Sequence, residues 1–280
     1  MMSNVTPSRL KPTVEWQVAG ACNYDCSYCI QSKRYRKGRP DSVQMDSALR
    51  AFAALPGTWE IKCSGGEAFA HPLFMSQIVP GLMEQTPHHI SVLTNLSATR
   101  PELMRFAALT RGRLRVFSAS LHLEFTALQD FIDKATWLVD QLDLDVDFVV
   151  NQVVFPGQEA QAAACRDAIE AVGLRWFPQL YKVNGGVAEF GPELERLIGA
   201  RPANRAPNFQ GLRCWAGVHY FAVDKDGRAW SCRSAKREKQ GLLGNIFDGS
   251  FERWTQSRAC PYTICPCTVP RNRGMIEGAA

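Results

Sequence analysis

Apolar residues over the first two thirds of the chain follow two alternating patterns. Short runs rich in β-branched and aromatic residues precede longer segments with helical periodicity. The predicted strands span 14–19, 59–63, 90–94, 114–121, 144–154 and 174–181. The predicted helices span 42–55, 72–85, 101–109, 127–142 and 158–172, and Thr99 and Pro101 mark the start of the third one. Strands that alternate with helices are typical of a parallel sheet covered by helices.

The number of these elements limits the architecture. Six strands separated by five helices are too few for a closed eight-stranded barrel. We therefore predict an α/β fold, with an open, partial (β/α)6 barrel over residues 12–182.

The last third of the chain has a different composition and no regular alternation of strands and helices. Residues 183–211 contain one glycine pair and several prolines and are interpreted as a bridging segment. Two short apolar runs, 219–223 and 228–232, flank the hairpin signal Asp224-Lys225-Asp226-Gly227, and a short helix is predicted over 251–257. We assign residues 212–270 to a small module of β-hairpin and helix, and residues 271–280 to a tail.

Composition and charge exclude several classes of protein. The chain has 280 residues, 46% of them apolar, and a net charge of +5, as expected of a globular protein with a slight excess of Lys and Arg. The densest basic run, 33–37, is too short to indicate nucleic-acid binding. No apolar run is long enough for a membrane span and no signal peptide is apparent, so we expect a cytoplasmic protein without a membrane partner.

The ten cysteines are clustered, three at 22–29 and five at 214–267, with Cys63 and Cys165 apart. In a reducing compartment such clusters indicate metal rather than disulfides. Cys22, Cys26 and Cys29 have the spacing C-x3-C-x2-C in the loop after the first predicted strand. Three thiolates can ligate three irons of a 4Fe–4S cluster and leave the fourth open, whereas a structural zinc site, the alternative, is normally closed by four ligands.

The sequence around these cysteines resembles the radical S-adenosylmethionine (SAM) superfamily. Its signature matches Cys22, Cys26 and Cys29, with Tyr28 at the aromatic position beside the adenine of the cofactor. Gly65-Gly66-Glu67 matches the GGE motif, which binds the methionine amino group. Thr94-Asn95 matches a further motif in which Leu96 replaces a glycine, and Ser118 is assigned to the same cofactor site.

The resemblance implies a definite chemistry. The open iron binds SAM, one electron from a donor such as flavodoxin or ferredoxin cleaves it, and the resulting 5′-deoxyadenosyl radical removes a hydrogen atom from a substrate. The substrate expected from the resemblance is a small molecule or carbohydrate. His122, after the fourth strand, is a candidate pocket residue, whereas Cys63 and Cys165 are interpreted as packing residues.

The second cysteine group resembles the SPASM/twitch modules that carry auxiliary clusters. The shared features are Cys214-Trp215-Ala216-Gly217, the hairpin end Asp226-Gly227 followed by Cys232, and the Gly-Asn-Ile step at 244–246. Five cysteines suit one auxiliary 4Fe–4S cluster, which we assign to Cys214, Cys232, Cys265 and Cys267. Cys260 is then the candidate free thiol. A four-thiolate zinc site is the alternative.

The surplus thiol decides the predicted reaction. An epimerase needs a hydrogen donor, so we predict epimerisation of a carbon in a sugar or aminoglycoside-type natural product, with Cys260 as donor. An alcohol dehydrogenase on a similar substrate would instead pass its second electron to the auxiliary cluster. A peptide-modifying enzyme and a redox sensor without turnover are the remaining alternatives. The absence of an N-terminal module for leader-peptide capture favours a small substrate.

Overall fold

The structure is a computed structural model that describes residues 10–184, 186–203, 205–266 and 268–279. A nine-stranded sheet forms its centre, in the order β12-β11-β10-β1-β2-β3-β4-β5-β6. The first six strands are β1 Thr13–Ala19, β2 Glu60–Gly65, β3 His89–Thr94, β4 Leu114–Leu121, β5 Asp147–Val154 and β6 Arg175–Leu180. All five neighbouring pairs among them are parallel, which confirms the predicted α/β class and partial barrel.

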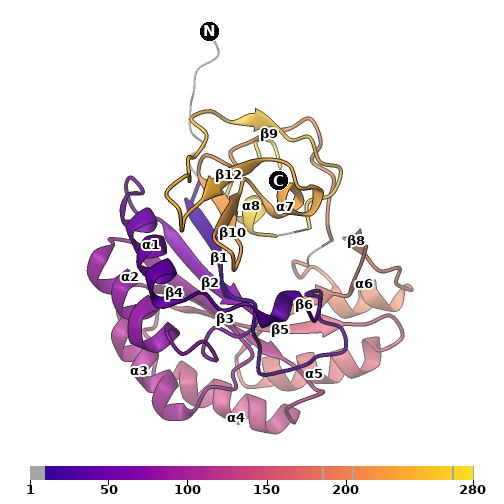
Figure 1. Cartoon of the computed structure of the whole chain (residues 1–280). Coiled ribbons are helices and arrows are strands. Elements are labelled where there is room, and N and C mark those ends of the chain that lie inside the picture. Colours follow the sequence, from indigo (N-terminus) through magenta and orange to yellow (C-terminus); the bar gives the residue numbers. More distant parts are fainter. Residues whose placement is uncertain (1–9, 185, 204, 267, 280) are drawn as a thin grey trace.

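Helices cover the outer face of this curved sheet (Figure 1). They are α1 Ser42–Ala53, α2 Val79–Gln85 with the preceding π-helix Phe74–Ile78, α3 Arg100–Thr110, α4 Leu128–Val139 and α5 Glu159–Ala171. A 3-10 turn, Tyr35–Lys37, follows β1. Asp41 and Thr99 form capping boxes at the starts of α1 and α3, so the predicted start of the third helix is confirmed.

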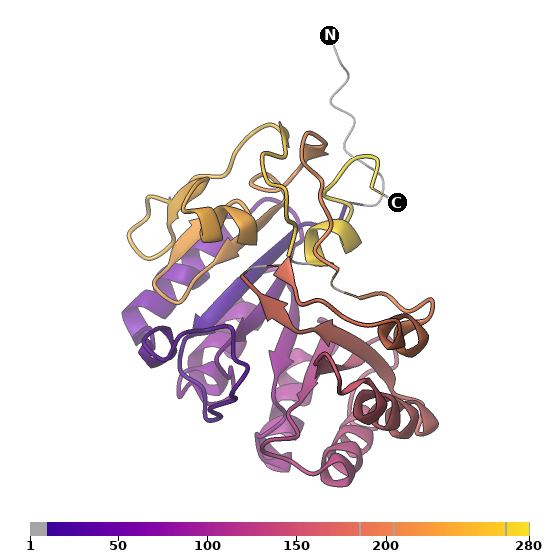
Figure 2. The same ribbon diagram turned by 90° about the vertical axis from the view of Figure 1, so that its right-hand side faces the viewer.

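The bridging segment and the C-terminal part contain short elements. These are β7 Lys182–Val183, β8 Gly186–Val187, α6 Glu193–Ile198, β9 Arg213–Cys214, β10 Tyr220–Val223, β11 Arg228–Trp230, α7 Arg233–Glu238, β12 Leu242–Asn245, β13 Arg258–Ala259 and α8 Thr268–Asn272. In Figures 1 and 2 the elements from β9 onward lie over one end of the barrel, as a lobe coloured orange to yellow, whereas α6 and β8 lie at the side, near α5 and β6.

The predicted hairpin is present, but it belongs to the barrel sheet. Strand β10 pairs in parallel with β1, and β11 and β12 continue antiparallel from it. The division into separate units at residue 212 stays a prediction, although the sheet runs across it.

The predicted helix over 251–257 is wrong, since the structure has no helix there. Backbone amides of this segment bond elsewhere in the lobe, from Glu252 to the carbonyl of Leu243 and from Trp254 to that of Gly217. A helix that the sequence did not suggest, α7, begins directly after Cys232 instead.

Two ion pairs join the C-terminal elements to the first strands. Arg233 of α7 lies 2.8 Å from the carboxylate of Glu15 in β1, and Arg273, just after α8, lies 2.6 Å from Glu60 in β2. Both carboxylates are more than 90% buried. The lobe is therefore fixed over the inside of the barrel by charged contacts as well as by packing.

Alternate residues of each strand face opposite sides of the sheet. The side toward the helices carries the hydrophobic core, for example Trp16 in β1, Ile61 and Cys63 in β2, and Phe117 in β4. The inner side carries mostly polar residues, and this polar surface faces the space beneath the lobe. Among the described residues, no helix is both long and apolar enough to cross a membrane.

Candidate active site

A cavity of about 330 Å³ lies inside the barrel beneath the C-terminal lobe. Nine residues predicted from the sequence line it together: Cys22, Cys26, Cys29, Tyr28, Gly65, Gly66, Thr94, Asn95 and Ser118. They come from the loop after β1, the carboxyl ends of β2 and β3, and the inner face of β4. Parallel strands commonly present their carboxyl ends to a ligand. His122 lines the same cavity, as the sequence suggested.

The loop that carries the three cysteines is held by bonds to each neighbouring strand end. The backbone amides of Gly66 and Glu67 donate to the carbonyls of Ala19 and Ala21 at 2.9 and 3.0 Å. Asn23 in the loop accepts from Asn95 beyond β3, at 2.9 Å. The loop is thus preorganised on the barrel.

The loop also reaches the segment after β4. Both the backbone amide and the hydroxyl of Ser27 donate to the carboxylate of Glu124. The ring of Tyr24 stacks on that of Phe125, with centroids 4.4 Å apart.

The three thiols differ in exposure but influence one another. Cys26 is buried, Cys22 is half-buried and Cys29 is exposed. Burial, together with the charges of Cys22, Cys29 and Glu124, raises the pKa of the Cys26 thiol to about 11. Without a bound cation the Cys26 sulfur is therefore protonated at neutral pH. A bound metal favours the thiolate forms instead.

Steric contact with the cysteine loop explains the two glycines of the GGE motif. A Cβ atom on Gly65 would lie 2.3 Å from the carbonyl oxygen of Ala19, and one on Gly66 would lie 2.0 Å from that of Ala21. The sequence suggested that the glycines admit a ligand to the backbone. They also admit the cysteine loop itself.

Glu67 does not line the cavity. Its carboxylate is buried and accepts from the hydroxyl of Thr94 at 2.7 Å and from the backbone amides of Asn95 and Phe69 at 2.6 and 3.1 Å. Three donors already occupy the side chain that the sequence suggested as a partner for the methionine ammonium. In this structure Glu67 fixes the ends of β2 and β3 relative to each other.

Leu96, which replaces the glycine of the motif, adopts the left-handed backbone conformation that glycine favours. Leu96 has a φ of 61°, in the left-handed region, and is buried. The hydroxyl of Thr94 accepts from its backbone amide at 3.1 Å.

Tyr28 and His122 form one wall of the cavity. The phenol oxygen lies 2.7 Å from Nδ1 of His122, and Cys26 Sγ lies 3.5 Å from the same nitrogen. Burial lowers the pKa of His122 to about 4, so the ring is neutral at physiological pH. The two rings are stacked, with centroids 5.9 Å apart, and form an aromatic surface beside the cysteines.

The residues present fit an iron–sulfur cluster with one open iron. Three thiols open onto one cavity, and among the described residues no group of three or more ligands is arranged for a single metal ion. A buried acceptor in the same lining, Oε1 of Gln31, has no hydrogen-bond partner among the residues that the structure describes, while its amide nitrogen donates to the carbonyl of Gly65 at 3.2 Å. The cavity therefore offers cluster ligands and an unsatisfied polar group for a bound molecule.

The four described cysteines of the second group belong to the lobe and do not line this cavity. Cys232 and Cys260 pack against the same apolar cluster around Trp230. Burial raises the pKa of Cys214 and Cys232 to about 11 and 12, with a smaller contribution from the charges of neighbouring thiols. Both Cys214 and Cys232, with Cys265, pack against one apolar cluster around Trp215. Cys267, the fourth predicted ligand, lies outside the described residues.

Cys260 is placed with the predicted ligands rather than with the cavity. It follows β13, which pairs with β9 so that Arg258 lies opposite Cys214. Its backbone amide donates to the carbonyl of Leu212 at 2.8 Å. This placement does not support the predicted role of Cys260 as hydrogen donor, whereas Cys63 and Cys165 are buried packing residues as expected.

The sequence analysis missed a set of charged and polar residues on the inner face of the strands. Several residues line the cavity that were not singled out: Glu15, Gln17, Lys62, Ser64, Ser120, Lys182 and Arg233. Polar residues two apart within predicted strands were the available signal, as at Glu15 and Gln17 or at Lys62 and Ser64. Arg233 had no such signal, since it comes from a helix that was not predicted.

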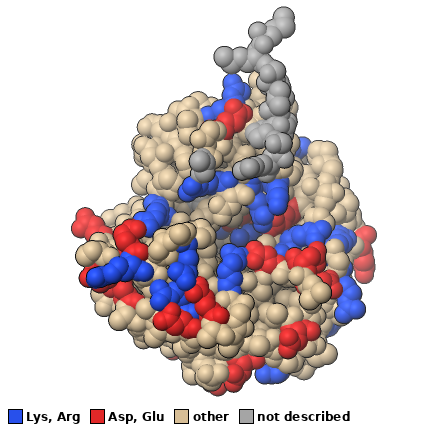
Figure 3. Space-filling view, turned by 180° about the vertical axis from the view of Figure 1, so that it is seen from behind, with Lys and Arg blue, Asp and Glu red and all other residues tan. Residues whose placement is uncertain are grey.

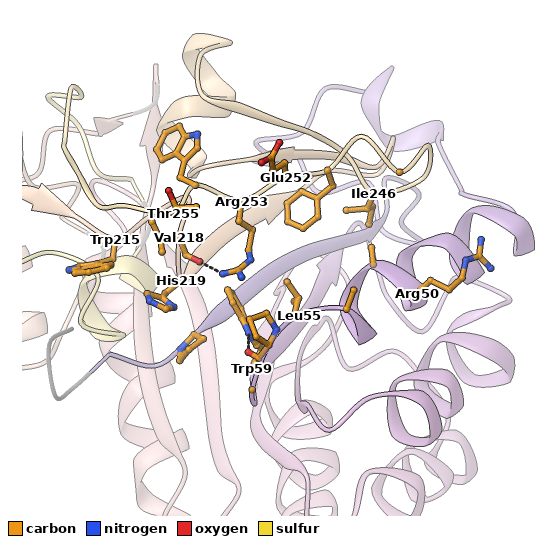
Figure 4. Close-up of a pocket in the computed structure, with 18 of the residues that line it drawn as sticks. Arg50, Leu55, Trp59, Trp215, Val218, His219, Ile246, Glu252, Arg253 and Thr255 are labelled. Atoms are coloured by element: carbon orange, nitrogen blue, oxygen red, sulfur yellow. Dashed lines mark hydrogen bonds between the residues drawn. The ribbon is translucent and has the colours of Figure 1, made fainter. Parts of the chain in front are cut away.

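A larger pocket of about 1190 Å³ opens at the opposite end of the strands (Figure 4). Its lining includes Pro12, Trp59 and His219, which directly precede β1, β2 and β10. Arg253 donates to the carbonyl of Val218 at 2.6 Å and lies 5.1 Å from the centre of the Trp59 ring. None of the described cysteines lines this pocket, so the larger volume does not mark the site of the cluster chemistry.

Comparison with known proteins gives short sequence matches and long structural ones. No family model matches the sequence. The GTP 3′,8-cyclases of two strains of Stenotrophomonas maltophilia, K279a and R551-3, are 39% identical over 71 residues, which is 24% of this chain and 22% of each relative. The match thus spans about a fifth of the length of these relatives.

Solved structures cover most of the chain at low identity. AnSMEcpe with bound AdoMet (SAM) has a TM-score of 0.60 at 14% identity and covers 86% of this chain and 76% of that one. SuiB of Streptococcus suis has a TM-score of 0.61 at 14% identity, covering 86% of this chain and 64% of that one. BtrN in complex with AdoMet and 2-DOIA scores 0.51 at 16% identity, with 86% and 80% covered.

These three structural neighbours are radical SAM enzymes. At such low identities they establish the fold, while the cysteine motif and the cavity come from this chain's own residues. The protein therefore has the fold of radical SAM enzymes, and the sequence of its cysteine loop resembles their signature motif.

Proposed function

We propose that the protein is a radical SAM enzyme that removes a hydrogen atom from a small polar substrate. The observation that carries this proposal is the convergence of three thiols, the Gly65-Gly66 edge and a polar inner barrel face on one cavity. When bound, the cluster and SAM would supply a 5′-deoxyadenosyl radical. The protein would supply ligands, orientation and protection from water.

The residues of the chain divide these tasks. Cys22, Cys26 and Cys29 are the proposed cluster ligands. Tyr28, beside His122, offers an aromatic surface for a flat ring, and Gln31 offers an amide oxygen to an N–H donor. The following lobe residues cover the opening and limit access of water: Arg233, Pro266, Thr268 and Val269.

We also propose that the lobe holds one auxiliary 4Fe–4S cluster, and that Cys260 is among its ligands. Cys260 packs against the same apolar cluster as Cys232, and it directly follows β13, which pairs with β9. This placement supports the assignment in place of a free thiol. Cys265, packed against the same apolar cluster as Cys214 and Cys232, is the proposed fourth ligand. Four thiolates would leave zinc as the competing occupant, which iron and zinc analysis separates.

The placement of Cys260 shifts the favoured reaction from epimerisation toward oxidation of an alcohol. Removal of a hydrogen atom leaves a substrate radical. Loss of one electron and one proton then gives a carbonyl product, and the auxiliary cluster would accept the electron. No thiol donor is needed, which agrees with a cavity whose described cysteines are all proposed ligands.

Epimerisation is the second candidate. The four ligands proposed above leave Cys267 as the surplus cysteine of the C-terminal group, and it would then be the hydrogen donor. Product analysis of the Cys267→Ala variant separates the two reactions. If the enzyme is a dehydrogenase, the variant still forms the two-electron oxidised product. If it is an epimerase, the variant no longer inverts the reacting carbon or incorporates solvent-derived hydrogen there.

The activity itself is tested without knowing the substrate. The anaerobically reconstituted protein is reduced with dithionite, or with flavodoxin or ferredoxin as the proposed donor, in the presence of SAM. We expect 5′-deoxyadenosine from the unaltered protein and from Cys165→Ala, and none from Cys26→Ala. Equal product from Cys26→Ala would refute the proposal.

A further inference from the structure

We propose that the substrate of this enzyme is an anion, a sugar-like molecule with a phosphate or carboxylate group that lies against Lys62 at the inner face of β2. The inference rests on the proposed function, because it assigns the substrate class of the same cavity. It also replaces the aminoglycoside-type substrate expected from the sequence, which would be a polycation.

The position of Lys62 is the first observation. Lys62 is paired in register with Glu15 of β1 and with Ser91 of β3. It lies on the inner face because Ile61 and Cys63 on either side belong to the core beneath the helices. Lys62 lines the cavity, is half-buried, and makes no hydrogen bond or ion pair with another residue that the structure describes.

The acidic side chain closest in register to Lys62 is already neutralised. Glu15 accepts from Arg233 at 2.8 and 3.3 Å and also from the hydroxyl of Tyr220. Burial alone would raise the pKa of Glu15, but Arg233, Lys62 and Tyr220 outweigh it and lower the pKa to about 2. One carboxylate therefore faces two cations.

The rest of the described lining increases this imbalance. Four basic side chains line the cavity, Arg36, Lys62, Lys182 and Arg233, against the single carboxylate of Glu15. Arg36 is balanced outside the cavity by Asp25, at 2.5 Å. Even with that pair discounted, three cations face one anion. Figure 3 shows Lys and Arg side chains gathered where the surface is hollowed between the lobe and the barrel.

The excess charge is not needed to balance the cysteines. The cysteine loop, through Cys26 and Tyr28, contacts His122 at the end of β4. The nearby carboxylates of Glu67 and Glu124 accept from other hydrogen-bond donors. Lys62 lies two residues before Ser64 on β2, farther into the barrel than the Gly65-Gly66 edge. Its charge is thus available to a molecule between the cluster and the barrel interior.

Neutral polar groups elsewhere in the cavity lining suit a hydroxylated scaffold. Asn151 donates to Ser118 at 2.6 Å, and Gln179 donates to Asn151 at 3.3 Å, so a connected set of amides and hydroxyls lines β4, β5 and β6. Such groups can exchange hydrogen bonds with sugar hydroxyls. The cation then selects for an anionic member of that class, and it opposes an amino sugar through like-charge repulsion.

Binding to the reconstituted protein with SAM bound tests the inference. The probes are glucose 6-phosphate, glucuronate, glucose and 2-deoxystreptamine, compared by anaerobic isothermal titration calorimetry. We expect at least one of the two anionic probes to bind about tenfold or more tightly than glucose, and 2-deoxystreptamine to bind no better than glucose. The two anionic probes distinguish a phosphate from a carboxylate.

Two variants localise the effect. Lys62→Met keeps the length of the side chain and removes its charge, so the preference for the anionic probe should disappear. Lys11→Met, at an exposed position outside the cavity, should keep it. Absence of any anionic preference in the unaltered protein, or a preference that survives Lys62→Met, overturns the inference. Failure of the proposed function is seen separately, as an unaltered protein that makes no 5′-deoxyadenosine from SAM.

Discussion

The buried pair between Glu15 and Arg233 allows a sharp test of how the lobe is fixed to the barrel. Glu15 is 4% exposed and Arg233 lies 2.8 Å from it. We consider the substitution Glu15→Gln, which keeps the size of the side chain and removes its charge. Arg233 would then keep at most a neutral acceptor in a partly buried position.

The magnitude follows from the pKa of Glu15. The charges around it outweigh burial and lower the pKa from 4.5 to about 2. A difference of that size between unfolded and folded states corresponds to about 3 kcal/mol of folding free energy. Removing one partner of a buried ion pair costs about 3–5 kcal/mol in other proteins, which agrees with this value.

The pH dependence has a definite sign. Because folding lowers the pKa, the stabilisation is fully present above about pH 4.5 and is lost as the pH falls toward 2. The difference in stability between the unaltered protein and Glu15→Gln should therefore be largest at neutral pH and shrink below pH 4.5.

Urea unfolding followed by circular dichroism measures both quantities. The matched control is Asp147→Asn, which removes a carboxylate from the half-exposed pair with Arg175 at 2.6 Å. Exposed pairs contribute about 0–1 kcal/mol, so this variant should be almost unchanged. If Glu15→Gln is destabilised no more than Asp147→Asn at pH 7, the reasoning about the buried pair is refuted.

Three further predictions concern the cluster loop, the second cysteine group and the larger pocket. Gly66→Ala should displace the cysteine loop, because the new Cβ would lie 2.0 Å from a carbonyl oxygen, and its reconstituted iron content should fall; Gly186→Ala, with its nearest contact at 3.7 Å, should retain it. Cys260→Ala should lower the iron content from about eight to about four per chain if Cys260 is an auxiliary ligand. Cys165→Ala should leave the iron content unchanged. Equal iron contents in the two variants would contradict the assignment. Arg253→Met should lower the free energy of unfolding by about 1–3 kcal/mol, since it removes the 2.6 Å hydrogen bond to Val218 and the contact with Trp59, and an unchanged urea midpoint would contradict this.

Much of the barrel was predictable because its strands and helices are marked by local signals. The fourth strand was predicted with its observed bounds, 114–121, and Thr99 caps the third helix as expected. The cysteine loop was recognisable because its ligands are close together in the sequence.

The C-terminal lobe was harder to predict because its elements depend on distant contacts. Strand β10 is ordered by parallel pairing with β1, about 200 residues earlier, and no local pattern reveals that. The segment at 251–257 has helical periodicity but bonds to Leu243 and Gly217 instead. Arg233 reaches the cavity only because α7 packs over β1.

The roles of Glu67 and Cys260 also depended on tertiary structure. A motif places Glu67 near the cofactor site, but only the fold shows that its carboxylate is already bonded by three donors. Counting cysteines left Cys260 as the surplus thiol, whereas in the fold it packs against the same apolar cluster as Cys232.

The central claim is that Cys22, Cys26 and Cys29 hold a cluster that cleaves SAM. The most direct measurement is 5′-deoxyadenosine formed per chain after anaerobic reconstitution and reduction, for the unaltered protein, for Cys26→Ala and for Cys165→Ala. We predict product from the first and third and none above background from the second. Product from Cys26→Ala at the level of the unaltered protein, or none from the fully reconstituted unaltered protein, would contradict the claim.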